Sequence, residues 1–167
     1  MKLKMKWLAL FLSVLGCLSV QAADEFRKAD TQLIALSPVQ NANRNKMDIS
    51  GIWDFKTDPS NLGESQQWFN GLADATSIAV PGSWNDQIEG LHNYLGTAWY
   101  QTKTFIPQNW KNERIYIRIG SASYAAKVWV NGKPAGMHEG GNLPFAFEIS
   151  SLVQYGQPNI ISIQQAM

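Results

Sequence analysis

Apolar and polar residues alternate along most of the chain beyond residue 48. The clearest run is 113–120, in which Ile115, Ile117 and Ile119 share one side. Because neighbouring side chains of an extended strand point to opposite faces, a period of two predicts a strand with one buried face. Similar runs are bounded by glycine, proline and asparagine. The pattern predicts eight strands, at residues 49–56, 77–80, 98–106, 113–120, 123–133, 135–138, 145–149 and 159–165.

Two glycine-containing corners divide the later strands. Asn131-Gly132 lies between two extended runs, a combination typical of a type I′ hairpin, because this turn needs positive φ at both central residues. The second corner, residues 139–142, contains Gly140 and Gly141. We therefore assign Asn131, Gly132, Gly140 and Gly141 to structural turns.

Helical periodicity is weak by comparison. Only residues 61–72 suggest a short helix or an ordered loop, with Trp68, Phe69 and Leu72 at approximately helical spacing. Eight short strands without a long helix predict an all-β fold, an antiparallel β-sandwich or jelly roll. Tryptophans fill such a sandwich with few residues, and we expect those on strands to lie in the core: Trp53, Trp99 and Trp129.

The N-terminus has the pattern of a secretory signal peptide. Three lysines precede a short apolar run at 7–15, and Ala22 ends a Val-Gln-Ala sequence suited to signal peptidase. This pattern predicts a leader over 1–22 and export to the periplasm or medium. Cys17 leaves a lipoprotein anchor as the less favoured alternative. With the leader removed the chain has no cysteine, so we expect a fold without disulfides.

The remaining sequence has the size of one domain. Its 167 residues carry a net charge of +1, and subtracting the three leader lysines gives 1 − 3 = −2. This balance argues against nucleic acid as a partner, and the apolar run of the leader is too short for a membrane span. We expect an extended arm over 23–46 and one domain over 47–167.

One loop carries groups suited to binding a carbohydrate. Sugar recognition combines flat aromatic faces with planar hydrogen-bonding side chains, and the loop 83–96 supplies both kinds. Its candidates are Trp84, Asn85, Asp86, Gln87, His92, Asn93 and Tyr94. Three roles remain open for this loop: contact with a sugar, packing against another domain, or local loop structure.

Catalytic and metal sites are less well supported. The loop carboxylates Asp86, Glu89 and Glu139 have no spacing that would pair them, as a glycosidase requires. His138-Glu139 invites a metal or acid–base interpretation, but adjacent strand residues point to opposite faces. We expect no catalytic residue, metal or cofactor in this chain.

Five motifs occur in an order that resembles a known family: 49–55 (ISGIWDF), 79–87 (AVPGSWNDQ), 98–101 (AWYQ), 127–132 (KVWVNG) and 139–145 (EGGNLPF). They are similar to those of the N-terminal sugar-binding domain of family 2 glycoside hydrolases, and most similar to its β-glucuronidases. The resemblance covers about residues 37–163. It implies a galactose-binding-like jelly roll.

In that family the domain is followed by an immunoglobulin-like sandwich and a (β/α)₈ barrel. The barrel holds two catalytic glutamates of a retaining mechanism. Both domains are missing from this sequence, so the resemblance implies a chain that is inactive alone. Gln165 stands where the strand pattern asks for an apolar residue, and the ending at Met167 is typical of a truncation or frame change.

Three hypotheses follow. The chain is the N-terminal part of an exported β-glucuronidase-like hydrolase, a stand-alone carbohydrate-binding module, or a fragment that folds poorly.

Overall fold

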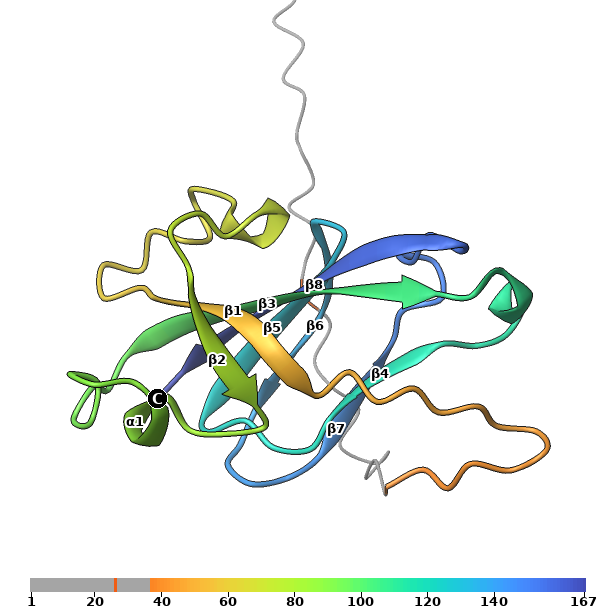
Figure 1. Cartoon of the computed structure of the whole chain (residues 1–167), viewed down its shortest axis with the longest axis horizontal. Coiled ribbons are helices and arrows are strands. Elements are labelled where there is room, and N and C mark those ends of the chain that lie inside the picture. The colour runs from red at the N-terminus through yellow and green to blue at the C-terminus, as the bar shows by residue number, and fades with distance from the viewer. Residues whose placement is uncertain (1–25, 27–36) are drawn as a thin grey trace, which may run out of the picture.

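In the computed structural model, Phe26 and residues 37–167 are described (Figure 1). The predicted leader, Cys17 and most of the predicted arm lie outside the described residues. Eight strands form, one in each predicted region: β1 (Gly51–Thr57), β2 (Thr76–Val80), β3 (Thr97–Ile106), β4 (Tyr116–Ile119), β5 (Ala125–Val130), β6 (Lys133–Glu139), β7 (Phe145–Glu148) and β8 (Gln157–Ala166).

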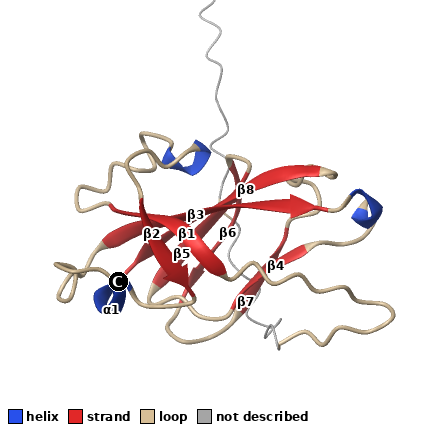
Figure 2. Cartoon of the chain, in the orientation of Figure 1, coloured by secondary structure: helices blue, strands red, loops and turns tan. Residues whose placement is uncertain are grey.

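The strands form two antiparallel sheets. The larger sheet has six strands in the order β2-β1-β3-β8-β5-β6, and the smaller consists of β4 and β7. Figure 2 shows how little of the described chain is helical: one turn of α-helix, α1 (Trp84–Gln87), and two 3₁₀ turns, η1 (Trp68–Asn70) and η2 (Gln108–Trp110). The predicted all-β antiparallel sandwich is confirmed.

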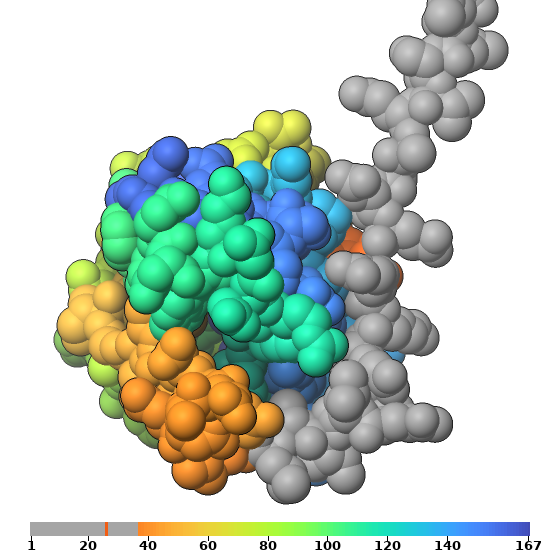
Figure 3. All heavy atoms as spheres, turned by 90° about the vertical axis from the view of Figure 1, so that its right-hand side faces the viewer, coloured from red at the N-terminus to blue at the C-terminus, as the bar shows by residue number. Residues whose placement is uncertain are grey.

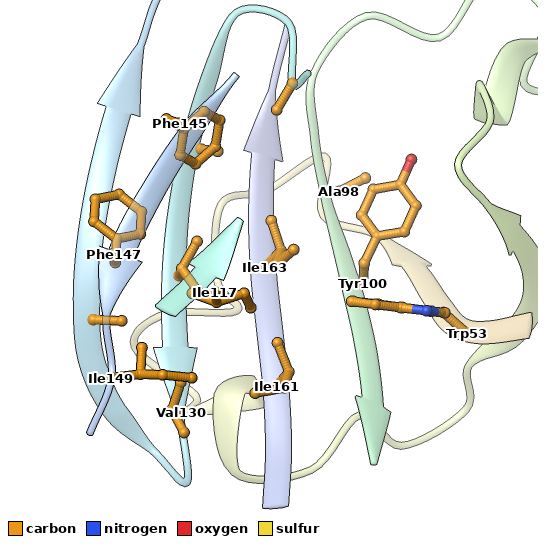
Figure 4. Packing of buried hydrophobic residues seen from close by; sticks show 14 of the residues in the cluster. Trp53, Ala98, Tyr100, Ile117, Val130, Phe145, Phe147, Ile149, Ile161 and Ile163 are labelled. Atoms are coloured by element: carbon orange, nitrogen blue, oxygen red, sulfur yellow. The ribbon is translucent and has the colours of Figure 1, made fainter. Parts of the chain in front are cut away.

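The inner face of the six-stranded sheet makes the hydrophobic core with the β4-β7 sheet. Alternate residues point inward, as Figure 4 shows for Tyr100, Ile161 and Ile163 of the large sheet and Ile117 and Phe147 of the small one. Burial of this face is the main stabilising contribution, because it removes apolar area from water. The alternation that predicted the strands is thus the alternation of this core.

The turn between β5 and β6 has the predicted conformation. Asn131 and Gly132 have φ of 52° and 77°, and Val130 pairs with Lys133 across them. The Asn131 side chain also donates to the Leu152 carbonyl at 2.9 Å and accepts from the Ile160 amide at 3.0 Å. Asn131 therefore serves both the turn and the attachment of the hairpin to β8.

The second corner also needs left-handed backbone. Gly140 has a φ of 136° and Asn142 a φ of 62°, whereas Gly141 does not have a positive φ. The assignment of this corner to backbone geometry holds for Gly140, with Asn142 as the second left-handed residue.

The outer face of the six-stranded sheet is covered by the segment 58–72, here called the cap. Asp58 holds its start, because its carboxylate accepts the Leu62 and Gly63 amides at 2.8 Å each and the Trp99 indole N–H at 3.0 Å. Gln101 holds its end by accepting the Leu72 amide at 3.0 Å. The region predicted as a short helix or ordered loop is therefore an ordered loop with one 3₁₀ turn.

The three strand tryptophans are buried, as predicted, but on two different faces. Trp53 lies in the inner core, whereas Trp99 and Trp129 lie under the cap on the outer face. There the rings of Trp99 and Trp129 stack at 5.0 Å, and Phe69 of the cap stacks on Trp129 at 5.4 Å. Aromatic burial thus stabilises both faces of the sheet.

The departure from the pattern at Gln165 does not interrupt the last strand. β8 continues to Ala166, paired with β3 on one side and β5 on the other. The Gln165 side chain donates to the Ser123 carbonyl at 2.8 Å. A polar side chain is tolerated at this inward-facing position because β8 ends here and the Ser123 carbonyl accepts its hydrogen bond.

Candidate functional site

The loop 83–96 lies at one end of the sandwich. Figure 1 shows α1 and the last residue of the chain side by side at this end, and the Met167 amide donates to the Gly96 carbonyl at 3.2 Å. Figure 3 looks at the opposite end, where η2 and residues 37–50 stand in the foreground. The candidate site and residue 167 therefore share one end of the molecule.

Trp84 belongs to the core rather than to a binding surface. It is 0% exposed, and its ring packs near Phe55, Tyr94 and Tyr100 at centroid distances of 5.9–6.2 Å. Its indole N–H donates to the Tyr94 carbonyl at 3.3 Å. The expectation that Trp84 offers its flat face to a sugar does not fit this burial, since both the ring and its donor are already in use.

Asn85 organises the loop internally. Its side-chain amide donates to the carbonyls of Leu91, His92 and Tyr94 at 2.6, 3.1 and 3.1 Å. Its backbone N–H is accepted by Ser83 Oγ at 3.2 Å, which caps the single turn of α1. Asn85 thus closes the loop on itself, because three carbonyls without ladder partners converge on one amide group.

Gln87 attaches α1 to the sheet. Its Oε1 accepts the Ala79 amide and its Nε2 donates to the Ala79 carbonyl, both at 2.9 Å. Gly82 leaves room for this arrangement, because an added Cβ there would meet Gln87 Nε2. The Gln87 side chain is therefore bound to β2 by two hydrogen bonds.

Tyr94 spans the base of the loop. Its hydroxyl donates to the Thr97 carbonyl at 2.7 Å, and burial raises the pKa of this phenol. With Trp84, Asn85 and Gln87, it is one of four predicted site residues that the structure uses to build the loop.

Asp86, His92 and Asn93 are exposed, as is Gln87, whose side-chain amide is already bound to Ala79. The structure adds apolar side chains that sequence reasoning missed: Leu95, Tyr124, Leu143 and Met167 are 77%, 61%, 62% and 43% exposed. The pairing of Thr97 and Ala125 with Ala166 brings the segments that carry Leu95, Tyr124 and Met167 to the same end of the sheet. Leu95 and Leu143 could have been noticed as large apolar residues within the predicted loop 83–96 and beside the predicted corner 139–142.

The arrangement offers little for catalysis. Asp86, Glu89 and Glu139 are exposed, whereas a general acid of a retaining glycosidase needs a carboxyl group with a raised pKa close to a second carboxylate. The buried Asp58 is fully engaged by the cap. Within residue 26 and residues 37–167, no group of three or more His, Cys, Asp or Glu side chains could hold a metal ion.

His138 and Glu139 point to opposite sides of β6, as expected for neighbours on a strand. His138 is 7% exposed and stacks on Phe145 at 4.3 Å, whereas Glu139 is exposed. His138 Nε2 is buried and has no hydrogen-bond partner. The two side chains do not form a joint acid–base pair.

These features define an antiparallel sandwich with surface loops gathered at one end and no catalytic constellation in the described residues. Residues 46–164 match the family model for the sugar binding domain of family 2 glycosyl hydrolases. The chain therefore belongs to this family and carries its sugar binding domain.

Within the family the chain is similar to β-glucuronidases. It is 38% identical over 131 residues to that of Paenibacillus borealis, an alignment covering 77% of this chain and 22% of the relative. The β-glucuronidase of Canis lupus familiaris is 38% identical over 133 residues, covering 72% and 20%. The crystal structure of Ruminococcus gnavus β-glucuronidase superposes with a TM-score of 0.76 at 34% identity, covering 78% and 23%. The chain spans about a fifth of the length of the curated relatives it matches.

Proposed function

We propose that this chain serves as the non-catalytic N-terminal domain of an exported β-glucuronidase-type hydrolase. The observation that carries the proposal is the match of residues 46–164 to the family 2 sugar binding domain, together with β-glucuronidase relatives at 38% identity. One similar structure is a Ruminococcus gnavus β-glucuronidase in complex with D-glucuronic acid. We infer a β-linked glucuronide as substrate class of the whole enzyme.

The role proposed for the loop end is packing against the other domains. Four of the seven predicted site residues are committed to the loop itself, which leaves few groups for a sugar. Leu95, Tyr124 and Met167 are instead exposed apolar side chains that neighbouring strands carry to this end, and exposed apolar surface is characteristic of interaction sites. Residue 167 lies within this end, so a longer chain would continue from it.

Export rests on the N-terminal pattern of lysines, apolar run and Ala22, which predicts a leader. In the part of the chain that the structure describes, no helix has the length and apolar character of a membrane span.

A paired assay tests the proposal. The chain itself and the longest reading frame that contains it are purified and incubated with chromogenic β-glucuronide and β-galactoside. We expect the chain alone to hydrolyse neither substrate, because its described residues hold no carboxylate pair arranged for catalysis, and the longer product to hydrolyse the glucuronide. Turnover by the pure chain would contradict the non-catalytic role.

A stand-alone carbohydrate-binding module is the second candidate, favoured by the solvent-facing Asp86, His92 and Asn93. It predicts that millimolar glucuronate or galactose raises the melting temperature of the chain. No shift with either sugar, at concentrations that saturate a weak site, would exclude this candidate.

A further inference from the structure

Phe26 makes a long-range contact on the outer face of the six-stranded sheet. Its ring lies 4.9 Å from the ring of Trp129, nearly perpendicular to it at 86°. Such perpendicular pairs are favourable because the positive edge of one ring meets the negative face of the other. Phe26 is thus attached to β5 although it lies far away in the sequence.

The contact completes the cover over Trp129. This ring stacks on Trp99 and Phe69, and it is 3% exposed although it lies on the outer face. The cap supplies Phe69, but Phe26 comes from before the first strand. The cover over Trp129 therefore has two sources, the cap and the N-terminal arm.

Lys127 joins these two sources. Its ammonium group forms an ion pair with Glu64 of the cap at 2.6 Å and lies 5.3 Å from the centroid of the Phe26 ring. A cation within about 6 Å of a ring centroid is attracted to the ring. The Lys127 ammonium group therefore contacts both Glu64 of the cap and the ring of Phe26.

The sequence around Phe26 suits a single-residue anchor. Phe26 is the only aromatic residue between Ala23 and Lys46, and its neighbours Asp24, Glu25, Arg27 and Lys28 are charged. The predicted leader cleavage after Ala22 leaves Phe26 in the exported chain. Phe26 is thus a large apolar residue isolated among charged neighbours, and the next large apolar residues of the arm are Leu33 and Ile34.

We propose that Phe26 anchors the N-terminal arm of this chain on the outer face of its own sheet, closing the aromatic cluster at Trp129. The occupant is the same chain, because Phe26 itself is seated there. The Trp129 ring stacks on Trp99 and Phe69, and Phe26 approaches the same ring nearly perpendicularly. Phe26 therefore belongs to the cover of this face, beside Phe69 of the cap.

Limited trypsin digestion of the full chain tests the proposal. The bonds after Arg27 and Lys28 lie next to the anchor, and cleavage tracks how often a segment is released. We expect F26A to speed cleavage at these two bonds about tenfold and to lower the melting temperature by about 2–4 °C. Intact mass spectrometry identifies the sites.

Two controls accompany this variant. F105A removes an exposed phenylalanine of β3 that is 54% accessible, so it should leave both readouts unchanged. Cleavage after Arg44 and Lys46, which are exposed and lie beyond the anchor, should be the same in every variant. F26Y should restore protection, because it keeps the ring.

Equal cleavage after Arg27 and Lys28 in wild type and F26A would overturn the proposal. Protection that disappears on dilution would also overturn it, since it would show that the arm docks on a second copy. An unchanged melting temperature in F26A would overturn it as well, because the ring would then contribute nothing to the cover over Trp129.

Discussion

The two faces of the six-stranded sheet are both buried, but by different means. The inner face packs apolar side chains against β4 and β7, and these contacts are non-directional. The outer face is covered by a loop, which Asp58 at its own start and Gln101 of β3 hold with hydrogen bonds. The inner face tolerates any apolar residue of suitable volume, whereas the outer face depends on individual donors and acceptors.

This difference concerns the two sides of the same strands. In β3, Tyr100 points into the core while its neighbours Trp99 and Gln101 contact the cap. In β8, the Ser162 hydroxyl accepts from Gln101 at 2.7 Å and donates to the Phe69 carbonyl at 3.0 Å. A sheet covered by a loop therefore buries polar side chains, because the backbone of the loop needs partners.

The largest effect is expected from truncating the inner face. Phe55 is 1% exposed and contacts the rings of Trp84 and Tyr100. Phe55→Ala should destabilise the domain by about 3–5 kcal/mol, because it removes apolar contacts and leaves a cavity. Urea unfolding followed by tryptophan fluorescence measures the change. An effect no larger than that of Phe105→Ala, at an exposed position, would contradict the assignment of Phe55 to the core.

A smaller and more local effect is expected on the outer face. Asp58→Ala leaves the Leu62 and Gly63 amides and the Trp99 indole without their acceptor, at a cost of about 2–3 kcal/mol. Hydrogen exchange should increase mainly in the cap, while the inner strands keep their protection.

Asp54→Ala is the matched control for this variant, because Asp54 is an exposed carboxylate on β1. Uniform loss of protection in Asp58→Ala would show that the two faces unfold as one unit. It would contradict the view that the cap is held separately by its own hydrogen bonds.

The inner face also predicts a response to alkaline pH. Burial raises the pKa of Tyr100 well above its ordinary value near 10. The folded state therefore retains the proton at a pH where the unfolded chain has lost it. The contribution of Tyr100 to the free energy of unfolding is fully present below pH 10. Above pH 10 it falls, by at most about 1.4 kcal/mol per pH unit.

Unfolding in urea between pH 8 and pH 11 checks this prediction. Tyr100→Phe should be less sensitive to pH than wild type, because the phenol is gone and the ring remains. Identical pH profiles of the two proteins would contradict the burial of this hydroxyl.

The smallest effect is expected for the ion pair on the outer face. Lys127 and Glu64 have side chains that are 34% and 42% exposed, so solvent screens their attraction. Glu64→Gln should cost about 0.2–1 kcal/mol, and the cost should shrink in 1 M salt. Thermal unfolding at low and high salt measures it, and a salt-independent loss would point to hydrogen bonding in place of charge.

The sequence pattern predicted the inner face well and the outer face poorly. Alternation located all eight strands, and Asn131-Gly132 located the hairpin, because both signals are local. The cap could not be derived in this way. Asp58 follows the first predicted strand with no local sign of its role, because its partner Trp99 lies 41 residues further along the chain. Hydrogen bonds over such separations depend on the finished fold.

The candidate site shows the same limit. The loop 83–96 was found from its composition, but the composition did not separate residues that build the loop from those that face outward. Trp84 and Asn85 have the chemistry of sugar-binding groups. Their side-chain N–H groups, however, already donate to the carbonyls of Tyr94 and its neighbours in the loop. Their roles became clear only from burial and hydrogen bonding, whereas Asp86, His92 and Asn93 remain open to a partner.

The bond pair between Gln87 and Ala79 also affects how the protein behaves in a crowded solution. β2 is an edge strand, and the unpaired N–H and C=O groups of such strands can recruit strands of other molecules into aggregates. Gln87 occupies both groups of Ala79 with its side-chain amide. At the other edge, β6 carries Pro134, which has no N–H to offer. A side chain at one edge and a proline at the other thus reduce the opportunity for the sheet to grow beyond the molecule.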